Sequence, residues 1–229
     1  MKGKGPDEVA FSGRITAAFT HEVKNVLAII KEASGLMEDL LLMSKAAPFP
    51  HKERFERAIG TIQAQVQRGV ELSTRLNRFA HSLDEPLASV DLKEIVDQFA
   101  LLAKRFATLR EMTLRSDAAS VDGTFNILTS PVRFQMALLA AVESCWAAMP
   151  PGGAVALLPE RREEGAAVMV SCEGDLGERD SFVEKVGSSK TWEALLEVQR
   201  VLGGTVEWVN GAYALRLVFP SGEEGARNK

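Results

Sequence analysis

The stretch FTHEVKNVLAIIKEASGLMEDL, residues 19–40, decides the fold of the first half of the chain. Its apolar residues recur at alternating steps of four and three, at Phe19, Val23, Val26, Ile30, Ala33, Met37 and Leu40. Such a heptad stripe predicts a long helix that packs against another helix. The segment AAPFPHKE (46–53) then interrupts the pattern with two prolines, which indicates a connection between two helices.

A second stripe with the same spacing follows, at Phe55, Ile59, Ile62, Val66, Gly69, Ser73, Leu76, Ala80 and Leu83. The two stripes together predict an antiparallel helical hairpin. Further apolar residues fall beside the stripes, at Leu27, Leu41, Val70, Leu72 and Phe79. One hairpin cannot cover all of these side chains, so we expect two chains to form a dimeric four-helix bundle.

The second half of the chain mixes strands with helices. We expect a helix from Leu92 to about Thr113 and another over 131–149, strands near 113–117, 125–128, 154–161 and 166–172, a helix at 190–202, and a closing hairpin of strands 204–209 and 212–219 turned at Asn210-Gly211. This order predicts an α/β sandwich separate from the bundle. The fold class is therefore α+β, with a helical hairpin at 1–86 and a sandwich domain at 87–229.

Composition excludes several classes of function. The chain has 229 residues, of which 46% are hydrophobic and 25% are charged, and its net charge is −4. These values are typical of a globular protein and predict neither a nucleic acid nor a membrane as partner. No apolar run reaches the length of a membrane span. Cys145 and Cys172 lie in apolar surroundings, which predicts reduced core thiols in a cytoplasmic protein and no metal site.

His21 is one of only three histidines in the chain. On a helical wheel it lies about 140–180° from the apolar stripe, so it faces solvent. Asn25, Lys24 and Arg14 share its face, and Glu22 lies between that face and the stripe. A neutral imidazole is a nucleophile near pH 7, a neighbouring carboxylate can accept its proton, and an amide one turn away can orient a phosphoryl oxygen or a water molecule.

Taken alone, an exposed histidine is more often an ordinary solvated residue than a catalytic one. His51 and His81 are interpreted in that way, because neither has a chemical neighbourhood of this kind. His21 is distinguished from them by its surroundings.

The stretch FTHEVKNVLAII (19–30) resembles the phosphoacceptor box of two-component sensor histidine kinases, H-E-x-x-N/T-P-L. His21, Glu22, Asn25 and Leu27 match, and Val26 replaces the usual proline, which predicts an unkinked helix. Hairpin, linker and α/β domain follow in the family order, so the resemblance covers nearly the whole chain. It implies a dimerisation and histidine phosphotransfer hairpin followed by an ATP-binding domain of the Bergerat type, with His21 as the phosphoacceptor.

The nucleotide-binding boxes depart from the family pattern. FQMALLAAVESCWAAMPPGG (134–153) is similar to the family's N-box helix, but Ala140 and Ser144 stand where two asparagines hold Mg²⁺ and the phosphates. In SCEGDLGERD (171–180), Glu173 and Asp175 replace the aspartate and the first glycine of the adenine box, and only Gly177 remains.

The glycine-rich lid of the family has no counterpart either, because no glycine stands between Gly187 and Gly203. We therefore expect a degenerate domain that does not bind ATP in the family's way, and no cofactor held by the chain itself. The competing interpretation is an unrelated α+β fold.

The resemblance supports three functions. In the first, the chain is a phosphorelay histidine phosphotransferase without ATP-dependent kinase activity, and His21 exchanges a phosphoryl group with aspartates of response-regulator receiver domains, which supply the Mg²⁺. In the second, it is a histidine kinase with a non-standard ATP site and Glu22 as general base. In the third, it is a dimer that binds a response regulator as a phosphatase or inhibitor, with Asn25 positioning the attacking water. The first is preferred, because the acceptor helix is intact while three nucleotide-binding elements are altered.

Overall fold

The computed structural model describes residues 6–43, 51–82, 86–123, 125–163 and 165–220. The predicted connection at 46–50 and the stripe residue Leu83 lie outside the described residues. The contacts divide the chain into two units, one of residues Gly13–His81 and one that contains Met1–Ser12 and Ser82–Lys229.

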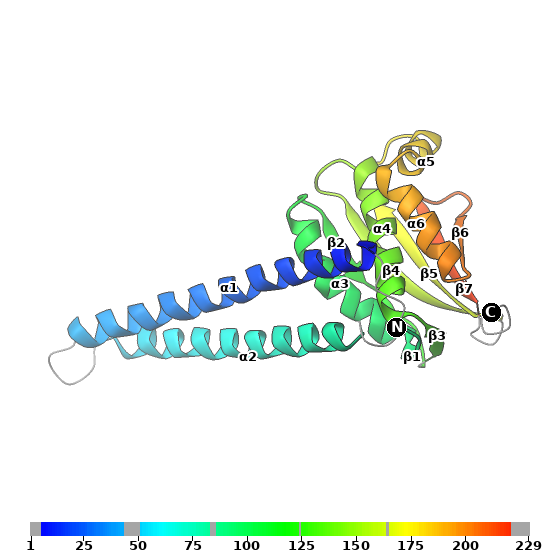
Figure 1. Ribbon diagram of the computed structural model, residues 1–229. Helices are drawn as coiled ribbons and strands as arrows, with labels where there is room; N and C mark the ends of the chain where they lie inside the picture. Colours follow the sequence, from blue (N-terminus) through cyan, green and yellow to red (C-terminus); the bar gives the residue numbers. More distant parts are fainter. Residues whose placement is uncertain (1–5, 44–50, 83–85, 124, 164, 221–229) are drawn as a thin grey trace. The chain divides into compact units, whose positions relative to one another are not determined.

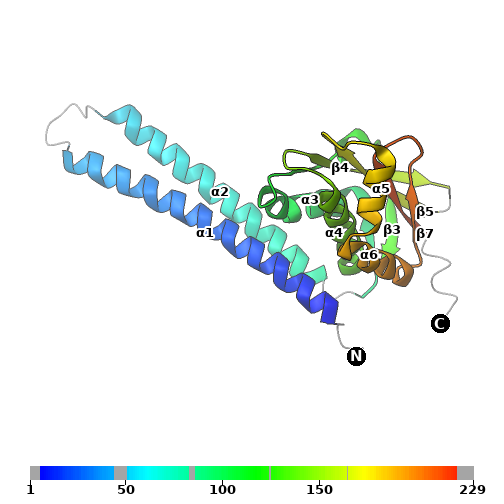
Figure 2. The same ribbon diagram turned by 90° about the horizontal axis from the view of Figure 1, so that it is seen from above.

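The first unit is a helical hairpin. Helix α1 (Pro6–Met43) and helix α2 (Lys52–Ser82) run antiparallel and side by side in both views (Figure 1, Figure 2). The whole predicted stripe of α1 is buried or half-buried, and Phe19, Val26 and Leu40 are among its most buried members. The heptad spacing of α1 therefore identifies the side of the helix that is buried within the chain. Val26 lies within an uninterrupted helix, as predicted.

The stripe predicted for α2 is partly wrong, because Val66, Ser73 and Ala80 are exposed. The inward residues are shifted by one position at several steps and are Ala58, Ile62, Gln65, Gly69, Leu72, Leu76 and Phe79. Both registers share residues 62, 69 and 76. The observed register of α2 places Leu72 and Phe79 on the inward side in place of Ser73 and Ala80, and this removes more apolar surface from water.

The second unit begins with a short strand and alternates helices with strands. Its elements are β1 (Ala88–Asp91), α3 (Leu92–Thr108), β2 (Thr113–Ser116), the 3₁₀ turn η1 (Ala118–Ser120), β3 (Asn126–Thr129), α4 (Pro131–Ala148), β4 (Ala154–Arg162), β5 (Gly165–Glu173), α5 (Arg179–Gly187), α6 (Lys190–Val201), β6 (Thr205–Trp208) and β7 (Ala214–Pro220). Strand β1, the turn η1 and helix α5 were not predicted from the sequence, and the helix expected from Leu92 to about Thr113 ends about one turn earlier, at Thr108. The remaining elements agree with the predicted ranges to within about two residues.

Five strands form one mixed sheet in the order β2-β4-β5-β7-β6, in which β2 runs parallel to β4 and the other neighbours are antiparallel. Strands β1 and β3 form a separate antiparallel pair. Helices α3, α4 and α6 pack against the large sheet (Figure 1, Figure 2). The register aligns fully buried residues of the central strands on one face, namely Val155, Leu157, Val168, Val170, Leu215 and Leu217.

The α+β class, with a helical hairpin first and an α/β sandwich second, is thus confirmed, while the dimer stays a prediction. Cys145 and Cys172 are buried free thiols. Hydrogen bonding to Cys172 and burial raise the pKa of the Cys145 thiol well above its ordinary value. Among the described residues, no helix is both long and apolar enough to cross a membrane.

Candidate functional site

His21 lies on the solvent side of α1, about one turn from Asn25, and both side chains are exposed. Lys24 is exposed on the same helix, whereas Val26, on the opposite side, is only 2% exposed. The heptad pattern places the apolar side of α1 inward, and this orients the histidine outward. The imidazole is thus open to solvent, with an amide and an ammonium group on the same side of the helix.

Glu22 lies between the exposed face and the packed side of α1, as the helical wheel predicts. Its carboxylate forms an ion pair with Arg68 of α2, with Arg68 Nη2 2.8 Å from Glu22 Oε2. The side chain of Glu22 is 26% exposed and that of Arg68 is 51% exposed. Arg68 was not predictable from the sequence, because only the register between α1 and α2 brings it to Glu22.

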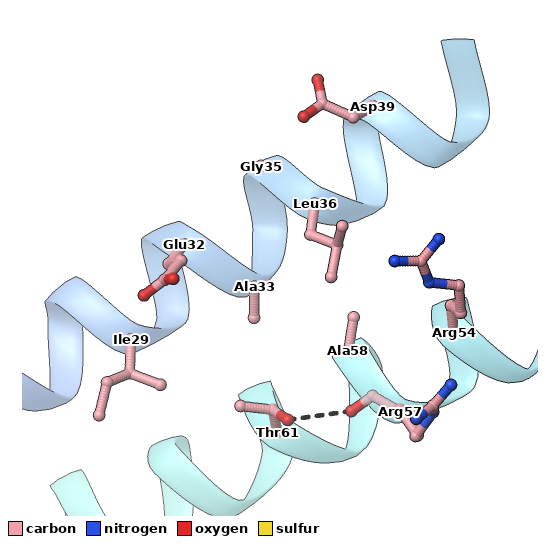
Figure 3. A pocket seen from close by; sticks show the side chains of 10 residues that line it. All are labelled: Ile29, Glu32, Ala33, Gly35, Leu36, Asp39, Arg54, Arg57, Ala58 and Thr61. Carbon is pink, nitrogen blue, oxygen red and sulfur yellow. Dashed lines mark hydrogen bonds between the residues drawn. The ribbon is translucent and has the colours of Figure 1, made fainter. Parts of the chain in front are cut away.

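A groove of about 800 Å³ runs between α1 and α2 and begins at Ile29, about two turns from His21 (Figure 3). Ala33, Leu36 and Ala58 form an apolar floor in which the two alanines face each other. The charged groups are segregated, since Glu32 and Asp39 come from α1 whereas Arg54 and Arg57 come from α2. The remaining lining residues are Gly35 and Thr61.

In the second unit, the positions that correspond to the N-box face inward. Ala140 is 9% exposed and Ser144 is 0% exposed. The Ser144 hydroxyl donates to the Ala140 carbonyl oxygen at 2.8 Å and lies 2.8 Å from the Thr191 hydroxyl of α6. The only side-chain oxygen at these two positions is thus engaged in a contact that joins α4 to α6. Thr191 was not predicted to take part.

The adenine-box positions are occupied by an ion pair and a tight turn. Glu173, at the end of β5, accepts two hydrogen bonds from Arg115 of β2, at 2.5 and 3.0 Å, and the Arg115 guanidinium lowers the pKa of this carboxyl. Gly174 has a φ of +135°, and a Cβ there would lie 3.3 Å from Gly153 Cα. Asp175 and Gly177 are exposed, and the Gly177 carbonyl accepts a hydrogen bond from the Tyr213 hydroxyl.

Helices α5 and α6 occupy the part of the chain where the glycine-rich lid is expected. Phe182 and Val186 of α5 are buried, and α5 packs against α4. Arg179 donates to the carbonyl oxygens of Val209 and Ala212, which ties α5 to the turn between β6 and β7. This segment is a packed helix, whereas a phosphate-binding lid needs a chain of accessible backbone amides.

These residues do not fit a nucleotide with Mg²⁺ in the family's way. Magnesium takes oxygen ligands in octahedral geometry, whereas Ala140 has no side-chain oxygen and that of Ser144 is buried. The carboxylate that would accept from an adenine amine is paired with Arg115. In the described part of the chain, no group of three or more His, Cys, Asp or Glu residues is arranged to hold a metal ion.

No protein-family model matches the sequence, and a search of curated proteins finds no significant match. Solved structures similar to this chain include histidine kinases. The catalytic domain of histidine kinase ThkA is 14% identical, with a TM-score of 0.47 over 60% of this chain and 98% of that one. Acinetobacter baumannii histidine kinase AdeS is 12% identical, with a TM-score of 0.45 over 88% and 98%.

ThkA in complex with the response regulator protein TrrA is 15% identical, with a TM-score of 0.42 over 94% of this chain and 63% of that one. These proteins belong to the family that the sequence resembles. At such identities and scores the likeness concerns the arrangement of elements and carries no argument about activity.

Proposed function

We propose that the chain is a cytoplasmic histidine phosphotransferase that exchanges a phosphoryl group between His21 and the aspartates of response-regulator receiver domains. The observation that carries this proposal is the contrast between the two units. His21 is exposed on a continuous helix with Asn25 and Lys24 beside it. In the second unit, by contrast, the N-box positions Ala140 and Ser144 are buried, and Glu173 of the adenine box is paired with Arg115.

In the proposed reaction, a neutral imidazole nitrogen of His21 attacks the phosphorus of an aspartyl phosphate on the receiver. A nitrogen–phosphorus bond forms, the phosphorus–oxygen bond breaks, and the aspartate leaves as a carboxylate. The proton on the other ring nitrogen passes to Glu22, and Asn25 donates a hydrogen bond to a phosphoryl oxygen. The reverse reaction passes the phosphoryl group to a second receiver. The chain supplies the acceptor and its orientation, and the receiver supplies the Mg²⁺.

The second unit supports this choice over an ATP-dependent kinase. A kinase must hold the triphosphate beside its catalytic domain, whereas here the Ser144–Thr191 contact joins α4 to α6 and the pair Arg115–Glu173 occupies the adenine box. We propose that this domain serves as a scaffold or docking surface.

Restoring the missing magnesium ligand by Ala140→Asn is expected to destabilise the protein rather than create kinase activity. The position is 9% exposed, so a larger polar side chain would be forced into packed surroundings at a cost of about 1–3 kcal/mol. Denaturant unfolding measures the loss, and incubation with labelled ATP and Mg²⁺ measures the activity. Ala194→Asn, at an exposed position of α6, is the matched control for stability. Labelling of His21 by ATP in Ala140→Asn would contradict this account of the domain.

We further propose that the chain is a homodimer through the hairpin. Apolar residues of the two helices remain at least half exposed, namely Leu27, Leu41, Leu42, Val66 and Val70. Leu27, Leu41 and Val70 belong to the five residues expected to need a second chain, whereas the other two, Leu72 and Phe79, pack within the hairpin. Covering them in a four-helix bundle would remove this apolar surface from water. Sedimentation equilibrium tests the proposal, and a monomer at micromolar concentration would contradict it.

We propose the groove beside the acceptor as part of the receiver-docking surface, together with the exposed residues Asn25 and Ala28. Its apolar floor and segregated charges suit a partner helix with an apolar face and charges of both signs. It begins about 12 Å along α1 from His21, so a docked domain of ordinary size covers both.

A charge on the floor of the groove is expected to weaken receiver binding. In Leu36→Glu the carboxylate would have to be desolvated on docking, and we expect the dissociation constant for a receiver that phosphorylates His21 to rise by about tenfold or more. Leu101→Glu, at a comparably exposed leucine of α3, is the control. Calorimetry measures binding, and analytical ultracentrifugation verifies that the oligomeric state is unchanged. Equal affinities of the two variants would remove the groove from the docking surface.

A phosphatase is the second candidate, and the exposed Asn25 one turn from His21 favours it, because an amide there can orient a water molecule toward an aspartyl phosphate. Substitutions at His21 and Asn25 distinguish the phosphatase from the phosphotransferase. A phosphatase keeps its activity in His21→Ala and loses it in Asn25→Ala, whereas a phosphotransferase requires His21.

A further inference from the structure

The ion pair between Glu22 and Arg68 joins the two helices at the level of the proposed acceptor. Arg68 Nη2 lies 2.8 Å from Glu22 Oε2, a distance typical of a charge-assisted hydrogen bond. Glu22 directly follows His21 in the chain, and its side chain is the more buried of the pair. A carboxylate on a free helix surface samples several rotamers, whereas this one is tied to the neighbouring helix.

The packing next to the pair brings the helices close together. Gly69 follows Arg68 on α2, and a Cβ at this position would lie 3.4 Å from Val26 Cγ1. This distance is an ordinary van der Waals contact, so Gly69 lies directly against the buried Val26 and the two helices are packed together beside the ion pair. The backbone on either side of Glu22 is thus held by packing, and Arg68 adds a directional contact to the carboxylate itself.

We propose that Arg68 is a positioning residue that orients the Glu22 carboxylate toward its task as proton acceptor for His21. Nucleophile, base and orienting group then follow the order found in catalytic triads, with the roles taken by His21, Glu22 and Arg68. The inference rests on the proposed function of His21 as a phosphoryl acceptor. It adds a residue of α2 to a site that the sequence places entirely on α1.

A purely structural ion pair predicts different behaviour. Exposed and half-exposed pairs contribute little to stability, so the loss of Arg68 would leave the fold intact and the chemistry of His21 unchanged. The positioning role instead predicts a loss of His21 reactivity without a loss of folding. It also predicts that the carboxylate has to stand on α1, next to the histidine.

The test uses phosphoramidate, a small phosphoryl donor, so that no receiver is needed. It reacts in its zwitterionic form, whose nitrogen already carries three hydrogens. The phosphorus–nitrogen bond breaks and ammonia leaves, a bond from phosphorus to the His21 nitrogen forms, and the imidazole proton passes to Glu22. Mass spectrometry follows phosphorylation of His21 in the full chain, with His51 and His81 as internal references. The variants are Arg68→Ala, Arg68→Lys and the exchanged pair Glu22→Arg/Arg68→Glu. Lys52→Ala, which removes the surface pair Lys52–Glu56 of the same helix, is the control.

In Arg68→Ala we expect the rate at His21 to fall by about tenfold or more, toward the rates at His51 and His81, which stay unchanged. Arg68→Lys should retain the wild-type rate within about threefold, because the contact engages a single guanidinium nitrogen. The exchanged pair should unfold at the wild-type temperature and react as slowly as Arg68→Ala. Lys52→Ala should match the wild type.

Two outcomes overturn the inference. If Arg68→Ala reacts at the wild-type rate, or if the exchanged pair recovers both stability and reactivity, Arg68 is no more than half of a structural ion pair. A wild-type His21 that reacts no faster than His51 and His81 has the same consequence. Transfer from a phosphorylated receiver to His21 is measured separately, so failure of the proposed function is distinguished from failure of this inference.

Discussion

Replacement of His21 by alanine is expected to reduce phosphoryl transfer from a phosphorylated receiver to the chain to background, because the nucleophile is removed. The fold is expected to survive. His21 is exposed on the solvent side of α1, and alanine has the higher helix propensity, so the free energy of unfolding should change by no more than about 0.5 kcal/mol. Labelled receiver and gel autoradiography measure the transfer, and circular dichroism measures the unfolding.

His81→Ala is the matched control, since it removes an exposed histidine near the end of α2 by the same substitution. It should accept the phosphoryl group as the wild type does. Undiminished transfer in His21→Ala, in a chain that is folded, would assign the acceptor to another residue and remove the proposed site.

Replacement of Val26 by aspartate is expected to unfold the hairpin. Val26 is 2% exposed on the packed side of α1 and lies against Gly69 of α2, so a carboxylate there would be desolvated without a partner. Losses of this kind reach about 4 kcal/mol or more, a large part of the stability of a domain. Helix content from circular dichroism and hydrogen exchange of α1 and α2 should both fall.

Ala28→Asp carries the same new charge two residues further along α1, at an exposed position. This substitution should lower the free energy of unfolding only by the difference in helix propensity between alanine and aspartate, about 0.7 kcal/mol. If Val26→Asp and Ala28→Asp unfold at the same denaturant concentration, the packed side of α1 is not the one described. Ile62 is half-buried at a stripe position that both registers of α2 share. Ile62→Asp should therefore also lower the free energy of unfolding.

The hairpin was predictable on α1 and only partly on α2, and the reason lies in their sequences. On α1 every residue of the stripe from Phe19 to Leu40 packs inward, and apolar residues beside it such as Leu27 and Leu41 stay exposed. On α2, Leu72 and Phe79 compete with Ser73 and Ala80 for the inward positions, and spacing alone does not choose between them. The choice depends on the area that each side chain buries against the facing helix. Strand β1 and helix α5 were missed because they are short and carry weak patterns.

The exposure of His21 followed from the helical wheel, since a heptad stripe determines the opposite face as well. Its contacts with other elements did not. The pair Glu22–Arg68 depends on the register between α1 and α2, and Ser144–Thr191 depends on how α6 packs on α4. No local pattern encodes such contacts between distant segments. The substitutions in the nucleotide-binding boxes could be identified from the sequence. The partners of the substituted residues, Thr191 for Ser144 and Arg115 for Glu173, could be identified only from the structure.

The most direct test of the central claim offers the purified wild-type chain two phosphoryl sources, labelled ATP with Mg²⁺ and a panel of labelled, phosphorylated receiver domains. The account predicts no label from ATP alone and acid-labile label on His21 from at least one receiver, which is then chased onto a second receiver. Acid-labile label on His21 from ATP alone would contradict it and establish a kinase with a different nucleotide site.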